Sequence, residues 1–232
     1  MQVFGDRSSG NCYKIELFCS ILKIDHDWVD IDVLAGDTHK AVFKKLNPNG
    51  KIPFVTLNDG NTLAEANAIL GFLAAGTPWL PTLGIKPAKT YEWLFFEQYS
   101  HEPFIAVARF IQYYQKCPPN AWRNIKNAMF MGRMRWTLWN TTRQNRFFGG
   151  YGPSIADIAL FAYTHVADQV GFELRKYPAI TRWIDDMKSL SGYTPITERL
   201  DWIHLTFLRG NFLSDPTGRR FCLLYTSPSP RD

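Results

Sequence analysis

The spacing of apolar residues changes once along this chain, and that change constrains the fold more than any other feature. Before residue 77, short segments of alternating polarity stand among short segments of helical spacing. Segment 77–89 holds three prolines and little periodicity, and beyond it nearly every apolar stretch has helical spacing. We therefore predict a mixed α/β domain over 1–76, a linker over 77–89 and an all-α domain over 90–199.

The first 76 residues predict a β-α-β unit followed by a β-β-α unit. Alternation or short apolar runs predict strands, and helical spacing predicts helices. The expected strands are 2–4, 28–34, 54–57 and 62–63, and the expected helices are 12–22, 40–46 and 65–75. Asn58-Asp59-Gly60-Asn61 marks a hairpin between the last two strands. This order of elements favours a thioredoxin-like sheet.

The second part predicts a helical bundle, with helices over 90–115, 122–142, 154–170 and 177–190. The third helix opens with Ser154-Ile155-Ala156-Asp157. In a capping box, the serine hydroxyl accepts the backbone N–H of Asp157, and the carboxylate reaches back to the N–H of Ser154. Residues 158–162 are apolar nearly all round, so we expect this helix at the centre of the bundle.

Composition excludes several classes of protein. The chain is 46% hydrophobic and 20% charged, which favours a folded domain over disorder. It has no apolar run of about 20 residues, and Asp6 stands where a signal peptide has its apolar core. The four cysteines form no C-x-x-C pair and no Cys/His cluster. We therefore expect a cytoplasmic protein with no metal site and no membrane partner.

One long stretch is basic. The net charge is +5, and no acid occurs from Pro103 to Ala156. A solvated helical face explains such a stretch, and attraction of small anions or of nucleic acid are the alternatives. No nucleic-acid motif surrounds it, so we expect no nucleic-acid partner. The bases are Arg109, Lys116, Arg123, Lys126, Arg133, Arg135, Arg143 and Arg146.

The last residues differ in character from the rest. Segment 222–232 resembles the translation of a transposase-type sequencing adapter, and we leave it out of the fold prediction. Segment 200–221 comes after the last stretch that has a clear place in the fold. We treat 200–232 as a tail.

Four motifs together resemble a known family. They are Ser9-Gly10-Asn11-Cys12, Asn47-Pro48-Asn49-Gly50-Lys51-Ile52-Pro53, Glu65-Ala66-Asn67-Ala68-Ile69-Leu70 and Ser154-Ile155-Ala156-Asp157. Their order and spacing resemble a cytosolic glutathione S-transferase over about residues 1–199, and the S-x-x-C spacing resembles its serine-type classes (theta, zeta, delta and bacterial relatives). The resemblance implies an α/β thioredoxin-like N-terminal domain plus an all-α C-terminal helical-bundle domain. It also implies glutathione as co-substrate and a homodimer in which the sheet domain of one subunit meets the helical domain of the other.

The resemblance makes Ser9 the catalytic candidate. The glutathione thiolate is the nucleophile, and Ser9 stands just before the first helix, whose N-terminus adds positive potential. Ser8 and Cys12 are the alternatives, although Cys12 has apolar partners at helical spacing and is expected in the core. Asn11 is a second candidate to donate an N–H to the thiolate.

Further residues are implied in glutathione binding. Ile52-Pro53 resembles the cis-proline turn of the family, whose backbone pairs with the cysteinyl residue of glutathione. Lys51 is expected to meet a glutathione carboxylate, as are His39 and Lys40, although a solvent-facing loop is the alternative for each.

The family usually has Glu or Gln followed by Ser at the start of the next helix. Glu65 is expected to hold the γ-glutamyl amine. Ala66 departs from the pattern because it lacks the hydroxyl that binds the γ-glutamyl carboxylate, which predicts roughly 10- to 100-fold weaker binding. The N–H of Ala66 at a helix N-terminus still attracts an anion.

The electrophile is expected between the sheet domain and the first long helix. Tyr99, Glu102, Ala106 and Arg109 share one face of that helix at three- and four-residue steps. Tyr99 and Arg109 are the candidates for contact with the electrophile or leaving group. Packing between helices for Tyr99 and a surface bridge for Arg109 are the alternatives.

The sequence therefore predicts an enzyme that conjugates glutathione to small electrophiles. A glutathione-dependent isomerase or peroxidase of the same fold is an alternative. A non-catalytic glutathione-transferase-like binding or scaffold protein is another, and Ala66 favours it.

Overall fold

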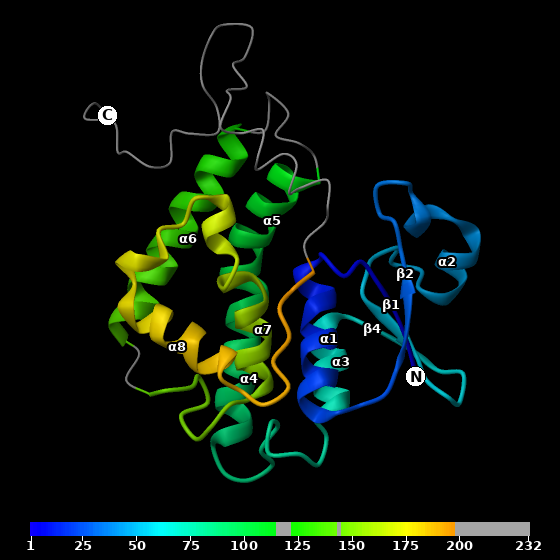
Figure 1. Ribbon diagram of the computed structural model, residues 1–232, viewed down its shortest axis with the longest axis horizontal. Coiled ribbons are helices and arrows are strands. Elements are labelled where there is room, and N and C mark those ends of the chain that lie inside the picture. Colours follow the sequence, from blue (N-terminus) through cyan, green and yellow to red (C-terminus); the bar gives the residue numbers. More distant parts are fainter. Residues whose placement is uncertain (115–121, 143–144, 198–232) are drawn as a thin grey trace, which may run out of the picture.

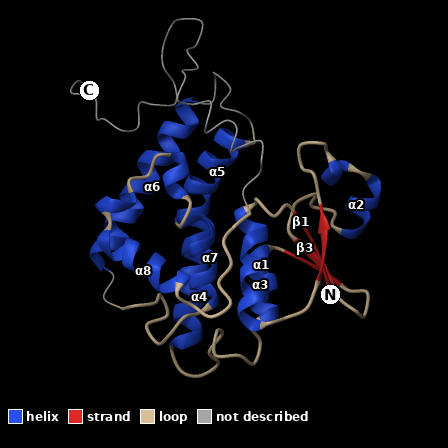
Figure 2. Ribbon diagram, viewed as in Figure 1, coloured by secondary structure: helices blue, strands red, loops and turns tan. Residues whose placement is uncertain are grey.

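The computed structural model describes residues 1–114, 122–142 and 145–197. Figures 1 and 2 show a sheet with helices at its faces, beside a bundle of helices formed by the second part of the chain. This arrangement confirms the predicted fold class, a thioredoxin-like domain followed by a helical domain. Predictions for 198–232, including the tail, lie outside the described residues.

The sheet is mixed and has the strand order β2-β1-β3-β4. β1 (Gln2–Gly5) is parallel to β2 (Asp27–Asp30) and antiparallel to β3 (Phe54–Thr56), which pairs with β4 (Thr62–Ala64). β2 is shorter than the predicted strand 28–34. The Asp32 carboxylate accepts the N–H groups of Leu34 and Ala35 at 2.9 and 3.0 Å, so a turn begins there.

The helices of the first domain lie on opposite sides of this sheet. α1 (Gly10–Leu22) and α3 (Ala66–Leu73) lie between the sheet and the bundle, whereas α2 (Ala41–Leu46) lies beyond the sheet in the view of Figure 1. α1 and α3 also contact each other and α7. The N-terminus of α1 is therefore placed at the boundary between the two domains.

The bundle contains α4 (Lys86–Phe96), α5 (Glu102–Tyr113), α6 (Trp122–Thr142), α7 (Ile155–Thr164) and α8 (Pro178–Lys188). α4 begins inside segment 77–89, with Pro87 in its first turn, where a missing N–H costs nothing. Short 3₁₀ turns lie at Asp37–His39, Ala167–Val170 and Leu174–Lys176.

The predicted helix 90–115 is interrupted by a π-helical turn, Glu97–His101, between α4 and α5. Pro103 is the second residue after this turn and has no N–H to donate to it, which explains the local change of helix type. The turn buries Glu97, which pairs with the equally buried Lys14 of α1 at 3.0 Å. The interruption thus joins the two domains through a buried ion pair.

α7 forms the centre of the bundle, as predicted, and all ten of its residues are buried. The Asp157 carboxylate accepts the backbone N–H and the hydroxyl of Ser154, both at 2.9 Å. It also accepts the N–H of Phe148 and the indole N–H of Trp183, both at 3.0 Å. Burial nevertheless raises the pKa of Asp157 above its ordinary value. One carboxylate therefore ties the start of α7 to the preceding loop and to α8.

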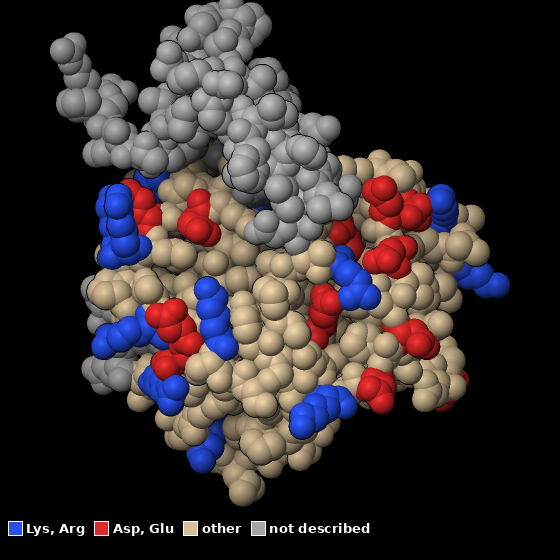
Figure 3. All heavy atoms as spheres, viewed as in Figure 1, with Lys and Arg blue, Asp and Glu red and all other residues tan. Residues whose placement is uncertain are grey.

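Two bases of the basic stretch have different surroundings. Arg109 is buried, and Arg146 pairs with Asp186 at 2.8 Å. On the face in Figure 3, acidic and basic side chains of the described residues are interspersed. Among the described helices, none is both long and apolar enough to cross a bilayer.

Candidate functional site

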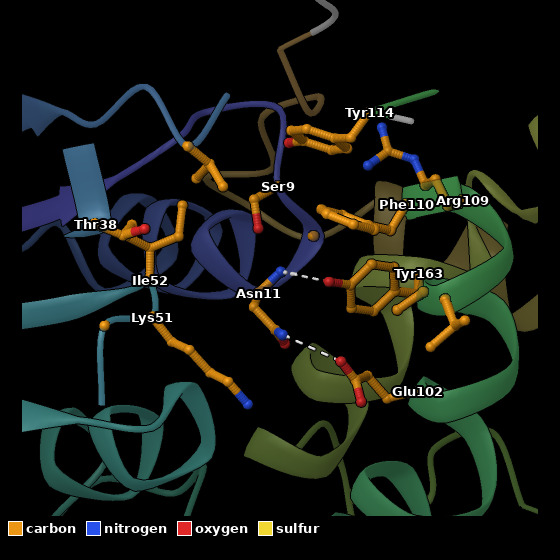
Figure 4. Close-up of a pocket in the computed structure, with 15 residues that line it drawn as sticks. Ser9, Asn11, Thr38, Lys51, Ile52, Glu102, Arg109, Phe110, Tyr114 and Tyr163 are labelled. Carbon is orange, nitrogen blue, oxygen red and sulfur yellow. Dashed lines mark hydrogen bonds between the residues drawn. The ribbon is translucent and has the colours of Figure 1, made fainter. Parts of the chain in front are cut away.

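A cavity of about 420 Å³ opens between the two domains. Its first wall is the N-terminus of α1, with Ser9, Gly10 and Asn11. Phe110 and Tyr114 at α5 and Tyr163 of α7 face this wall across the cavity (Figure 4). The site is therefore built by both domains.

A second cavity, of about 180 Å³, adjoins the first. The two share the lining residues Asn11, Lys51, Ile52 and Glu102. The second cavity is the more polar in its side chains, because it is also lined by Asn47, Asn49, Glu65 and Gln98. An elongated polar ligand can therefore lie along both cavities.

Ser9 is the serine of its turn that reaches the cavity. It precedes α1 with an extended backbone, and its side chain makes no helix-capping hydrogen bond. Its hydroxyl can turn toward a ligand sulfur without uncapping the helix.

The alternatives to Ser9 are buried. Ser8 is 1% exposed, and its hydroxyl donates to Asp6 at 2.5 Å. Cys12 is 0% exposed, and burial raises the pKa of its thiol to about 12. Neither residue lines the two cavities. A protonated, enclosed thiol is a poor nucleophile, so Cys12 belongs to the core, as its spacing predicts.

Asn11 connects the two domains. Its backbone N–H donates to the Tyr163 hydroxyl at 3.2 Å, and its side-chain amide donates to Glu102 at 3.3 Å (Figure 4). Burial raises the pKa of Glu102. Gly10 permits the approach of Tyr163, because a Cβ at residue 10 would lie 2.4 Å from the Tyr163 ring. The glycine in the first motif thus has a steric role.

The second cavity collects most of the other predicted glutathione residues. It is lined by Lys51, Ile52, Pro53, Glu65 and Ala66, and the Ile52-Pro53 bond is cis, as the resemblance implies. The described part of the chain makes no hydrogen bond to the backbone N–H or C=O of Ile52.

Glu65 has an unusual backbone beside this cavity. Its φ of 70° is rare for a residue other than glycine, and such conformations occur most at binding and active sites. Glu65 accepts a weak hydrogen bond from Asn49 at 3.5 Å, and Ala66 begins α3 directly after it. The first N–H groups of α3 therefore lie at the edge of the second cavity, because the helix begins at Ala66, which lines it.

Three predicted residues are not brought to the cavities. His39 is exposed and lines neither cavity, while its neighbour Thr38 lines the larger one. Lys40 pairs with Asp37 at 2.6 Å. Tyr99 is 81% exposed and also lines neither cavity.

Arg109 lines the larger cavity but is 2% exposed, so it is not a surface bridge. Its guanidinium donates to the backbone carbonyl of Ser8 at 2.8 Å and to the side chain of Gln169 at 3.0 Å. It therefore contacts the turn before α1 as well as the cavity.

Sequence reasoning missed Thr38, Tyr114 and Tyr163, which line the larger cavity. The sequence contains one indication of a role for Tyr163. A tyrosine on a helix that is expected to be buried needs a hydrogen-bond partner for its hydroxyl. No pattern in the sequence indicates the other two. Within the described ranges, no three metal-binding side chains gather into a group that could bind a metal ion.

Two family models match the chain. Residues 8–75 match the glutathione S-transferase N-terminal domain, and residues 131–190 match the glutathione S-transferase C-terminal domain. A solved glutathione S-transferase from Pseudomonas fluorescens Pf-5 is 43% identical, with a TM-score of 0.82, and the match covers 85% of this chain and 98% of that one.

More distant relatives differ in the roles that their names give. Protein URE2 from Eremothecium gossypii is 26% identical over 227 residues, and the match covers 80% of this chain but only 64% of that relative's length. Disulfide-bond oxidoreductase YfcG from Escherichia coli is 26% identical over 187 residues, and the match covers 77% of this chain and 86% of YfcG. A solved structure of Ure2p in complex with glutathione has a TM-score of 0.72 at 21% identity, covering 82% of this chain and 90% of that one. The two matched domains, in the order that the fold has them, and the 43% identity show that this chain belongs to the glutathione S-transferase family.

Proposed function

We propose that this protein conjugates the glutathione thiolate to small electrophiles, with Ser9 as the residue that stabilises the thiolate. The observation that carries the proposal is the position of Ser9, which lines the larger cavity at the N-terminus of α1 with its hydroxyl uncommitted to capping. A hydroxyl donor and the positive end of a helix both favour the anionic form of a thiol. The mixed polarity of the two adjoining cavities supports a ligand with a polar peptide and a reactive sulfur.

Glutathione is proposed to lie across both cavities. Ile52 offers its unbonded backbone N–H and C=O to the cysteinyl residue, as an added strand does. Glu65 lines the second cavity and is proposed to hold the γ-glutamyl ammonium, while the N–H groups at the start of α3 are proposed to attract the γ-glutamyl carboxylate. Lys51 lines both cavities and supplies a positive charge for a carboxylate of the peptide.

The electrophile is proposed to be small and apolar. The part of the larger cavity that faces Ser9 from α5 carries Ala106, Val107 and Phe110, and Val33 lines it from the first domain. These side chains can bury an apolar or aromatic substrate beside the sulfur. We propose no role at this position for Tyr99, which lies outside it.

The test is a comparison of the wild-type protein with Ser9→Ala. The thiolate absorbance of bound glutathione is titrated, and conjugation of a panel of electrophiles is measured across pH. Ser9→Ala should raise the apparent pKa of the bound thiol by roughly one to two units, because it removes a hydrogen bond to a charged group. The loss in kcat should shrink at high pH, where the thiol ionises unaided. Coincident titration curves would remove Ser9 from the mechanism.

A non-catalytic glutathione-binding protein is the second candidate. Ala66 favours it, because the hydroxyl that the family usually supplies at this helix start is missing. Retention on immobilised glutathione without turnover of any electrophile in the panel would select this candidate. Retention together with turnover would select the enzyme.

We also propose a homodimer. Tyr91, Phe95 and Tyr99 recur every four residues and are 44, 71 and 81% exposed, and Phe72 of the first domain is 50% exposed. Apolar side chains of this size at helical spacing are typical of a covered surface. Light scattering should give about twice 26.7 kDa for the wild-type protein. Phe95→Glu should give the monomer mass, and a wild-type monomer at micromolar concentration would contradict the proposal.

A further inference from the structure

Two side chains of the helical domain form hydrogen bonds with the turn that precedes Ser9. Arg109 donates from its guanidinium to the backbone carbonyl of Ser8 at 2.8 Å. The hydroxyl of Tyr114 donates to the Asp6 carboxylate at 3.0 Å and lies 3.1 Å from the hydroxyl of Ser8. Both side chains come from α5 or its C-terminal cap, more than 100 residues along the chain.

The turn's own polar groups converge on the same carboxylate. Asp6 accepts the backbone N–H of Ser8 at 2.9 Å and its hydroxyl at 2.5 Å, and the Asp6 carbonyl accepts the N–H of Ser9 at 2.9 Å. Ser8, Arg109 and Tyr114 are 1, 2 and 9% exposed. Hydrogen bonds in such a dry environment are strong, and an unmade one is costly. The conformation of the turn is therefore fixed from two domains at once.

This arrangement lies next to the reacting position. Arg109 and Tyr114 line the same cavity as Ser9, and Ser8 is the residue covalently joined to it. The guanidinium and the tyrosine hydroxyl both contact Ser8, one at its backbone carbonyl and the other at its hydroxyl. A small displacement of Ser8 moves the Ser9 hydroxyl relative to any sulfur in the cavity.

We propose that Tyr114 and Arg109 are positioning residues, which act through Ser8 to set the Ser9 hydroxyl against the bound thiol. The inference rests on the proposed function of Ser9. It adds that the geometry of the thiolate site, which lies on the sheet domain, is determined in part by the helical domain. Bonds that only joined the domains would contribute to stability and leave the thiol unaffected.

The experiment compares Tyr114→Phe with Tyr13→Phe. Each removes the hydroxyl of a buried tyrosine that makes a hydrogen bond, but the Tyr13 hydroxyl donates to the carbonyl of Thr194 at 2.6 Å, and Tyr13 lines neither cavity. The measurements are the thiolate absorbance of bound glutathione against pH, the affinity for S-methylglutathione, which has no thiol, and the urea midpoint of unfolding.

Tyr114→Phe should raise the apparent pKa of the bound thiol by roughly half a unit to one unit and lower kcat/KM near pH 7 about 2- to 10-fold. The difference should vanish at high pH, and the affinity for S-methylglutathione should stay unchanged. Tyr13→Phe should lower the urea midpoint and leave the thiol titration where the wild type has it.

The outcomes separate this inference from the proposed function. If Ser9→Ala shifts the thiol titration and Tyr114→Phe does not, the positioning role is overturned and the role of Ser9 stands. If the wild-type protein binds no glutathione thiolate, the proposed function and this inference both fail. Ser8→Ala is the second variant, since it removes the hydroxyl that Asp6 and Tyr114 both contact. If Tyr114→Phe does not fold, the absence of a shift in Ser8→Ala overturns the inference.

Discussion

At the scale of single residues, Ala66 lacks the hydroxyl that the family resemblance implies at the start of α3. Ala66→Ser adds a hydroxyl at the first residue of α3, beside the N–H groups that we propose attract the γ-glutamyl carboxylate. The affinity for glutathione should rise by roughly 10-fold, since a hydrogen bond to a charged group contributes about 1.5–3 kcal/mol and ordering the hydroxyl offsets part of it. Isothermal titration with glutathione measures the change.

A matched control for this variant is Ala68→Ser, two residues further along α3 and exposed. It should leave the affinity unchanged, because it lines neither cavity. Equal affinity of Ala66→Ser and the wild-type protein would mean that the carboxylate is already satisfied by backbone N–H groups or Lys51.

At the scale of elements, the buried pair Lys14–Glu97 joins α1 to the π-helical turn. Both side chains are 0% exposed, and Asn67 of α3 accepts from Lys14 at 3.2 Å and donates to Glu97 at 2.9 Å. Lys14→Met should lower the free energy of unfolding by about 3–5 kcal/mol, because it leaves a buried carboxylate without its counter-charge. Lys14→Met/Glu97→Gln should regain much of this loss, since no uncompensated charge remains.

Urea unfolding of the wild-type protein, the single variant and the double variant measures the effect. A double variant no more stable than Lys14→Met would show that packing of the lysine stem, rather than charge, accounts for the loss.

The same π-helical turn shows where sequence patterns stop being informative. The strands and the buried α7 can be predicted from local alternation, local helical spacing and the Ser154–Asp157 cap, and all of these are visible in a few neighbouring residues. The predicted common face of Tyr99 and Arg109 assumes one unbroken helix. A π-helical turn holds one extra residue, which rotates the helix before it by roughly 100° relative to the helix after it. Tyr99 lies inside this turn and is exposed, whereas Arg109 lies in α5 after the turn and lines the cavity.

The candidate site divides in the same way. Ser9, Lys51, Ile52 and Glu65 stand in motifs of a few residues, so resemblance alone brings them to one region. Tyr114 and Tyr163 meet the first domain only because the domains pack together, as in the hydrogen bond from Asn11 to Tyr163 across 152 positions of sequence. Contacts between residues so far apart in the sequence depend on how whole elements pack together. They therefore produce no periodic pattern in the sequence.

At the scale of the whole molecule, the buried His101 and the half-buried His165 make the free energy of unfolding sensitive to acid. Burial lowers the pKa of His101 to about 3 and that of His165 to about 4, from an ordinary value of 6.5, and the charge of Lys14 adds to the effect at His101. The unfolded chain therefore binds protons that the folded protein does not. Their contribution is fully present above about pH 6.5 and is lost as the pH falls from there toward 4.

Each histidine should remove up to about 1.4 kcal/mol of unfolding free energy per pH unit within this window. His101 accepts the indole N–H of Trp136 at 3.4 Å and contacts the Thr164 hydroxyl at 3.0 Å, and glutamine can supply both an acceptor and a donor there. His101→Gln should thus keep the fold and lose unfolding free energy more slowly between pH 6.5 and 5. Asp157 and Glu102, whose pKa values are raised, act in the opposite sense but equally in all variants.

Urea unfolding at several pH values measures the slopes, with His39→Gln at an exposed position as the control. Parallel slopes for the wild-type protein and His101→Gln would show that His101 takes up its proton in the folded state.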